Sequence, residues 1–185
     1  MGTFQTSDAV ANAKLNAYET TVGTSPILRL RNGTMPANCA AARSGTILAT
    51  INLPSDWLGN ASSRTKVKTG TWEDPSADAS GYATQWELMD SSGTTCHFQG
   101  LVSQPWVPNT AWASGQQCHI NGLVFRCTTP GTSASSGGPS GTGTGITDGT
   151  VVWAYAGPES MTMTNTNIAT TQQVTVSAFD FTAAN

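Results

Sequence analysis

Gly122-Leu-Val-Phe-Arg-Cys-Thr-Thr-Pro-Gly-Thr and Gly141-Thr-Gly-Thr-Gly-Ile-Thr-Asp-Gly-Thr-Val-Val-Trp-Ala-Tyr predict two β-strands joined by a loop of Gly, Ser and Thr. β-Branched and aromatic residues favour strands, and Gly and Pro mark where strands end. Five large aromatic side chains gather in and just before these segments: Trp106, Trp112, Phe125, Trp153 and Tyr155. The pattern indicates a small β module that builds or displays an aromatic surface.

The position of this region within the chain predicts an insertion. We expect residues 104–157 to form a small aromatic-rich β module, and residues 1–103 plus 158–185 to form one discontinuous host domain. A module of this size needs some of its aromatics for its own core. We assign Phe125 and Trp153 to that core, and expect Trp106, Trp112 and Tyr155 to be exposed. Exposed aromatics stack on sugar rings or mark contacts between proteins.

The flanking sequence predicts further strands, because apolar and polar residues alternate between turn signals. The clearest hairpin joins Tyr82–Met89 to Thr94–Val102 around Asp90-Ser-Ser-Gly. Other expected strands are Pro26–Arg31, Thr46–Leu53, a short one near Val67, Ser160–Thr164 and Gln173–Phe181. We expect the last two to pair antiparallel with each other, with the final strand in a central position or otherwise an important member of the sheet.

A single helix is expected near the N-terminus, over Ser7–Thr21, with a cap at Ser7 or Asp8 and an end at Gly23. Its expected apolar stripe consists of Val10, Ala13, Ala17 and Tyr18. Many short strands with Gly, Pro and Asn turns indicate an all-β protein. We therefore predict an antiparallel, jelly-roll-like β-sandwich base with one short N-terminal helix and an inserted small β module.

The composition argues against several partners. Only 10% of the 185 residues are charged and the formal net charge is −3, so no basic surface for nucleic acid is expected. Arg64, Lys66 and Lys68 would share one face of a strand, as a solvated face or a contact for an acidic partner. No signal peptide or membrane-spanning segment is predicted, which favours synthesis in the cytoplasm and no membrane partner.

The four cysteines are expected to be free thiols, because cytoplasmic synthesis disfavours disulfides. Cys118 and Cys127 could lie near each other across a hairpin, so a disulfide between them stays open as the alternative. Cys96-His97 and Cys118-His119 suggest zinc, but neighbouring strand residues point to opposite faces and cannot share one ion. We expect no metal and no cofactor.

Catalytic motifs are not found in the sequence. The nucleophile motif Gly-x-Ser-x-Gly is absent, and the loop Gly141–Gly149 lacks the Gly-Lys-Ser/Thr end of a phosphate-binding loop. Glu73, Asp74 and Asp78 lie in a Pro- and Ser-containing loop of the kind that solvates its charges. We therefore expect a protein without enzymatic activity.

Two resemblances suggest a function. Ile27-Leu-Arg-Leu-Arg-Asn-Gly-Thr-Met-Pro, Ile47-Leu-Ala-Thr-Ile-Asn-Leu and Val174-Thr-Val-Ser-Ala-Phe-Asp-Phe resemble a family of small virion proteins of tailed bacteriophages. This resemblance covers roughly residues 5–102 and 158–183. The family's turn after the first strand, of the Tyr-Thr-Gly-x-x-Pro kind, takes the form Arg31-Asn-Gly-Thr-Met-Pro here.

The insertion resembles a module of phage appendage proteins and is similar to small chitin-binding-type carbohydrate modules. The resemblance rests on Trp106-x5-Trp112-x2-Gly115, Phe125-Arg-Cys-Thr-Thr and the run from Gly141 to Trp153. Two positions depart from it, because Trp112 and Phe125 stand where such modules often have Tyr.

Together the resemblances imply a capsid decoration or cement protein on the virion surface. Its partner would be the major capsid protein, and copies would associate with one another on the capsid. The alternative is a head or tail appendage that binds a host-surface glycan or receptor through Trp106, Trp112 and Tyr155. An internal tail or baseplate component is a third reading.

Overall fold

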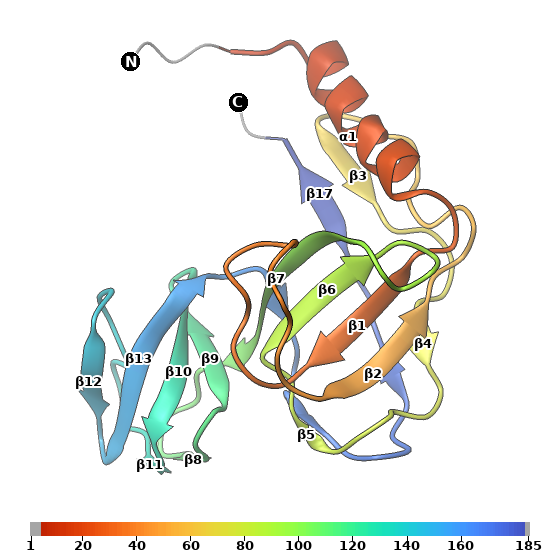
Figure 1. Ribbon diagram of the computed structural model, residues 1–185. Coiled ribbons are helices and arrows are strands. Elements are labelled where there is room, and N and C mark those ends of the chain that lie inside the picture. The colour runs from red at the N-terminus through yellow and green to blue at the C-terminus, as the bar shows by residue number, and fades with distance from the viewer. Residues whose placement is uncertain (1–4, 184–185) are drawn as a thin grey trace.

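The computed structural model describes residues 5–183 and shows an all-β protein with one N-terminal helix, which confirms the predicted fold class (Figure 1). The helix is α1 (Asp8–Val22). The strands of the first part of the chain are β1 (Ile27–Arg31), β2 (Ile47–Asn52), β3 (Thr65–Val67), β4 (Glu73–Asp74), β5 (Gly81–Tyr82), β6 (Gln85–Met89) and β7 (Cys96–Pro105). Those of the middle part are β8 (Ala111–Trp112), β9 (Gln117–Ile120), β10 (Leu123–Thr129), β11 (Gly131–Thr132), β12 (Thr144–Asp148) and β13 (Val151–Pro158). The last four are β14 (Met161–Thr162), β15 (Asn167–Ile168), β16 (Val174–Thr175) and β17 (Asp180–Thr182).

One mixed sheet runs through the whole molecule, in the order β12-β13-β10-β9-β7-β6-β1-β2, with β14 paired to β7. Most neighbours are antiparallel, but β9 and β14 both pair with β7 in parallel. The ten residues of β7 are the link, because its first part pairs with β6 and its last two residues pair with β9. Four two-stranded sheets complete the fold: β11-β8, β15-β5, β16-β4 and β17-β3.

The buried apolar side chains form two separate clusters. One packs around Trp57, Trp72 and Trp86, beneath β1, β2, β6 and β7. The other packs around Phe125 and Trp153, beneath β9, β10 and β13. The first cluster draws its buried residues from outside 104–157 and the second draws them from inside that range. The proposal that the two parts are separate domains stays a prediction, since the sheet itself is continuous.

The helix forms as predicted but turns a different side inward. Ser7 caps it by accepting a hydrogen bond from the backbone N–H of Val10, and Gly23 ends it with φ 88°. Its buried residues are Ala11, Leu15 and Val22, whereas the predicted stripe positions Val10, Ala13 and Ala17 are exposed. Of the predicted stripe only Tyr18 packs inward, against Phe98 and Phe181, and polar side chains of the helix make further contacts.

Those polar contacts follow helical spacing. Asn12, Asn16 and Glu19 each accept a hydrogen bond from the backbone of the segment 58–64. Residues 12, 16 and 19 lie on one face of a helix, so the same face binds the segment over about two turns. The helix therefore caps the backbone donors of an irregular segment that has few strand partners of its own.

Two of the charged residues that were expected in contact with solvent are buried, whereas Glu73 and Asp78 are exposed as expected. Lys66 is buried, and its ammonium contacts Glu19, Asn16 and the carbonyl of Gly59. Asp74 is also buried, and its carboxylate accepts the backbone N–H groups of Thr50 and Ser76. Each charge has a partner far along the chain, Glu19 for Lys66 and Thr50 for Asp74, which local sequence does not reveal.

The C-terminal strands correct a third expectation. The segment at β14 pairs with β7, whereas β16 pairs with β4 and β17 pairs with β3. Neither segment pairs with the other, and the last strand is not central. Figure 1 shows β17 next to β3 and α1, away from the main sheet. The two segments instead face each other across an open groove.

Candidate binding groove

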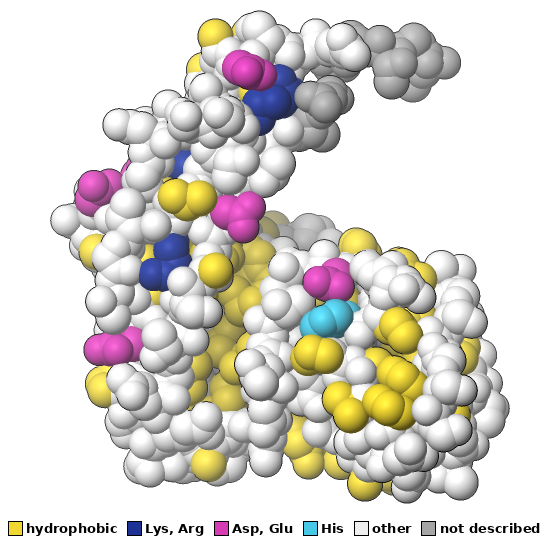
Figure 2. Space-filling model, turned by 180° about the vertical axis from the view of Figure 1, so that it is seen from behind, with side chains coloured by type: hydrophobic (Ala, Val, Ile, Leu, Met, Phe, Trp, Pro, Cys, Tyr) yellow, Lys and Arg dark blue, Asp and Glu magenta, His cyan; other side chains and the backbone are white. Residues whose placement is uncertain are grey.

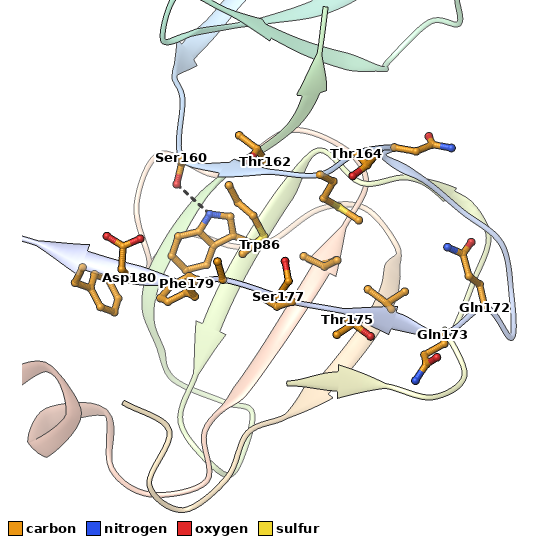
Figure 3. A pocket seen from close by; sticks show the side chains of 18 residues that line it. Trp86, Ser160, Thr162, Thr164, Gln172, Gln173, Thr175, Ser177, Phe179 and Asp180 are labelled. Carbon is orange, nitrogen blue, oxygen red and sulfur yellow. Dashed lines mark hydrogen bonds between the residues drawn. The ribbon is translucent and has the colours of Figure 1, made fainter. Parts of the chain in front are cut away.

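Two extended segments form the walls of a groove on the surface of the host part. One wall is the segment 160–165 with β14, and the other is the segment 172–181 with β16 and β17 (Figure 3). In the described residues, each of these strands pairs along one side only. Such strands leave a second edge whose backbone groups are free to pair with an added chain.

The floor of the groove is apolar. Leu30, Trp86 and Val174 are buried members of the larger core cluster, and they reach the groove from beneath. Half-buried side chains cover them on both sides: Met161, Met163, Val176 and Phe179. Figure 2 shows hydrophobic side chains at the bottom of a hollow on this rear face. The groove thus exposes part of the core in a space of about 660 Å³.

The rim of the groove is polar and almost uncharged. Hydroxyl and amide side chains line it: Ser160, Thr162, Thr164, Asn165, Gln172, Gln173, Thr175 and Ser177 (Figure 3). Asp180 is the single charged residue among the lining residues. Hydroxyl and amide groups donate and accept hydrogen bonds without favouring either sign of charge. This chemistry suits a neutral ligand that has both apolar and hydrogen-bonding groups.

Trp86 is held rigidly in the floor. Its indole N–H donates to Ser160 Oγ over 3.0 Å, and its ring meets Phe179 edge-on with centroids 5.6 Å apart. Gly100 makes this arrangement possible, because a Cβ at that position would come within 2.5 Å of Trp86 Nε1. The hydrogen bond ties one wall to the floor, so the groove is preformed in the free protein.

The aromatic residues of the middle part lie elsewhere, and one prediction about them was wrong. Trp112 is only 2% exposed and packs edge-on against Trp153, with centroids 5.1 Å apart. Phe125 and Trp153 are core residues, as predicted. Trp106 and Tyr155 are half-buried. Trp112 is buried because a small module has too few apolar residues to leave three large rings in water.

Asp148 organises this smaller core. Its buried carboxylate accepts the indole N–H of Trp106 over 2.7 Å, that of Trp153 over 3.2 Å and the backbone N–H of Ala134 over 3.0 Å. A buried carboxylate is costly unless its oxygens are hydrogen-bonded, and these three donors supply that compensation. Sequence reasoning missed this role: Asp148 is the last residue of β12 and lies in the Gly141–Gly149 stretch that was expected to be a loop.

All four cysteines are free thiols in the structure. Cys118 and Cys127 are buried in the smaller core, and burial raises the pKa of both thiols. His119 contacts Ser103 through Nδ1 at 3.1 Å. Within residues 5–183, no group of His, Cys, Asp or Glu side chains has the arrangement of a metal site. Of the helices that the structure describes, none is long and apolar enough to cross a membrane.

Comparisons with protein-family models, with curated proteins and with solved structures find no match. The groove is therefore interpreted from its own chemistry. The sequence did contain one signal for it, since the alternating patterns around 160–164 and 173–181 each predict one apolar face. Those two segments were expected to pair with each other. In the structure they do not pair, and their apolar faces flank the open groove.

Proposed function

We propose that this chain is a structural protein of a tailed-phage virion, a decoration or cement protein that binds the outer surface of the major capsid protein. One observation carries the proposal: an apolar groove with an uncharged rim lies between two single-sided strand edges. An extended polypeptide fits the apolar floor, the uncharged rim and the free strand edges at once. Its side chains enter the floor, its backbone pairs with an edge, and it needs no compensating charge.

The occupant we propose is an extended segment of the major capsid protein. A preformed groove lowers the ordering cost of binding for the decoration protein, so the cost falls mainly on the arriving segment. Contacts of moderate strength become strong when many copies act on one shell. Binding to the assembled shell then stabilises that state by mass action.

The proposal is tested with phage heads that lack the protein. The purified chain is added to expanded heads, and bound copies are measured by sedimentation and located by electron microscopy. Ala178→Arg places a long charged side chain at the exposed lining of the groove and should reduce head binding at least tenfold. Ser135→Arg adds the same charge at an exposed position of the middle part and should bind as the wild type does.

Two results would overturn this function. If the Ala178→Arg variant is folded and binds heads as the wild type does, the groove is not part of the contact with the capsid. Wild-type protein that ignores heads but binds a glycan array would favour the appendage reading. For that reading one observation counts: Trp106 is half-buried and its ring is fixed by Asp148, as a sugar-stacking platform requires. Loss of glycan binding in Trp106→Ala would then identify the site.

A further inference from the structure

Lys66 brings a buried primary amine into contact with an amide and a carboxylate of the helix. It lies on β3, and its side chain is 1% exposed. Its Nζ lies 3.1 Å from Asn16 Oδ1, 3.0 Å from Glu19 Oε2 and 2.7 Å from the carbonyl oxygen of Gly59. These three contacts hold the nitrogen beside the carboxamide group of Asn16.

The Asn16 carboxamide is oriented by a second donor. The backbone N–H of Ala61 also donates to Asn16 Oδ1, over 3.0 Å. Because both neighbours of this atom are donors, it is the carbonyl oxygen, and the amide nitrogen Nδ2 points away from them. A donor at the carbonyl oxygen stabilises the negative charge that a nucleophile creates there when it attacks Cγ. The Ala61 N–H therefore has the position of an oxyanion donor.

Glu19 completes the group as a base. It follows Asn16 by three positions in α1, so the two side chains are neighbours on one face of the helix. One carboxylate oxygen contacts the Lys66 ammonium, and the other accepts the backbone N–H of Leu58 over 3.4 Å. An ammonium becomes a nucleophile only when it loses a proton, and a carboxylate in contact with it can take that proton.

We propose that Lys66 and Asn16 join through an intramolecular isopeptide bond after the chain has folded. The chain folds with the ion pair described above, and Lys66 Nζ then passes a proton to Glu19. The amine attacks Asn16 Cγ and forms a tetrahedral intermediate with its negative charge on Oδ1. The Cγ–Nδ2 bond breaks, and Nδ2 leaves as the amide carbonyl reforms. Nζ gives up two protons in all, and the leaving nitrogen takes both, by way of Glu19, and departs as NH₄⁺. The reaction is redox-neutral and regenerates the carboxylate.

The bond would fasten the helix to an irregular part of the fold. Figure 1 shows α1 beside β3, at one end of the molecule. The hydrogen bonds from the segment 58–64 to the helix already hold the two together. A covalent bond between residues 50 positions apart closes a long loop in the unfolded chain, and this favours the folded state. The inference is independent of the proposed function, because it concerns one chain alone.

The experiment follows the full chain by intact mass spectrometry, as purified and during incubation at pH 7. We expect the loss of one ammonia, about 17 Da. Trypsin should then release one branched peptide that joins residues 15–29 to residues 65–68, because the modified Lys66 is no longer cleaved. The bonded chain should melt about 10 °C above the unbonded chain.

Four variants separate the chemistry from the packing. Lys66→Arg and Asn16→Ala each remove one reacting group and should keep their full mass. Glu19→Gln keeps both reacting groups and should slow the loss of ammonia at least about 100-fold. Lys14→Arg replaces an exposed lysine of the same helix and should form the bond at the wild-type rate.

The wild-type mass decides the matter even where a variant fails to fold. The proposal is overturned if the wild-type chain keeps its full mass, or if the ammonia is lost from another asparagine without a branched peptide. Loss of water with a branch at Glu19 would also overturn it, because the carboxylate would then be the group attacked. Equal rates in Glu19→Gln and the wild type would overturn the role of Glu19 as the base.

Discussion

Trp106 donates its indole N–H to Asp148 over 2.7 Å, and this bond joins the entry of the middle part to the end of β12, 42 residues later. The same carboxylate holds Trp153, so one buried charge fixes two large rings. Buried donors lose their water on folding and need this acceptor. Asp148 is thus the polar centre of an otherwise apolar cluster.

Replacing that carboxylate should destabilise the middle part strongly. Asp148→Ala leaves two indole N–H groups and the Ala134 N–H without an acceptor, and should cost about 3 kcal/mol of unfolding free energy. Asp148→Asn keeps one oxygen and should cost less. Urea unfolding followed by tryptophan fluorescence measures both, with the exposed Asp56→Ala as the control. A cost for Asp148→Ala as small as that of the control would contradict the role of Asp148.

The burial of Trp112 leads to a second prediction. Trp112→Ala removes a large ring from the smaller core and should cost about 4 kcal/mol. Tyr155→Ala removes a half-buried ring and should cost about 1–2 kcal/mol, because its site stays open to water. Thermal or urea unfolding ranks the two variants. Equal costs, or a larger cost for Tyr155→Ala, would show that Trp112 is not a core residue.

The hairpin around Asp90 and the burial of Trp112 show which features can be predicted from the sequence and which cannot. The hairpin around Asp90 was predicted because its signals are local: two alternating segments and a turn rich in Ser and Gly. Trp112 was misplaced because residue type shows that a ring is apolar, but not which segment covers it. Its covering partner, Trp153, lies 41 positions later in the sequence.

Contacts between segments far apart in the sequence also explain why the groove was not predicted. The apolar faces near 161 and 176 were visible in the sequence, but their partners were not. β17 pairs with β3, more than a hundred residues earlier, and β16 pairs with β4 at a similar separation. Pairing at this distance depends on the whole chain, so local alternation predicts the strands and leaves the neighbours open.

Lys66 provides a third prediction. Its ammonium lies 3.0 Å from Glu19 Oε2 and 2.7 Å from the carbonyl of Gly59, with the side chain 1% exposed. Lys66→Met should cost about 2 kcal/mol, since Glu19 is partly exposed and recovers some hydration. The double variant Lys66→Met with Glu19→Gln should regain part of that loss. A double variant less stable than Lys66→Met, measured by urea unfolding, would contradict the pairing.

Asp90 predicts a dependence on pH. The backbone N–H of Thr94 and then the hydroxyl of Ser92 hydrogen-bond to the carboxylate and hold the pKa of Asp90 well below its usual range. A lowered folded-state pKa gives stability that is present above the unfolded pKa of about 3.9 and is lost as the pH falls through the folded value. Asp90→Ala should therefore lower the Tm at pH 7, and the difference should shrink toward pH 2. A difference that stays constant would contradict this account.

The contacts at β7 set the limits of a deletion that tests whether the host part folds alone. Gln104 accepts two hydrogen bonds from Thr166 and belongs with the host part, and Gly157 packs against Leu101. Removing residues 106–156 and joining the ends with a short Gly/Ser turn keeps both contacts and all of the larger cluster. The carbonyls of Thr84 and Val102 lose the Gln117 amide but regain water.

We therefore expect the shortened chain to melt cooperatively, with a Tm lower by roughly 5 °C. Trp57, Trp72 and Trp86 remain in it and report the larger core by fluorescence and near-ultraviolet circular dichroism. The matching chain that carries Gly/Ser in place of residues 135–138 and 140–142, with the buried Pro139 kept, retains the smaller core and should melt as the full chain does. A shortened chain without a cooperative transition would show that the two clusters form one folding unit, joined by β7.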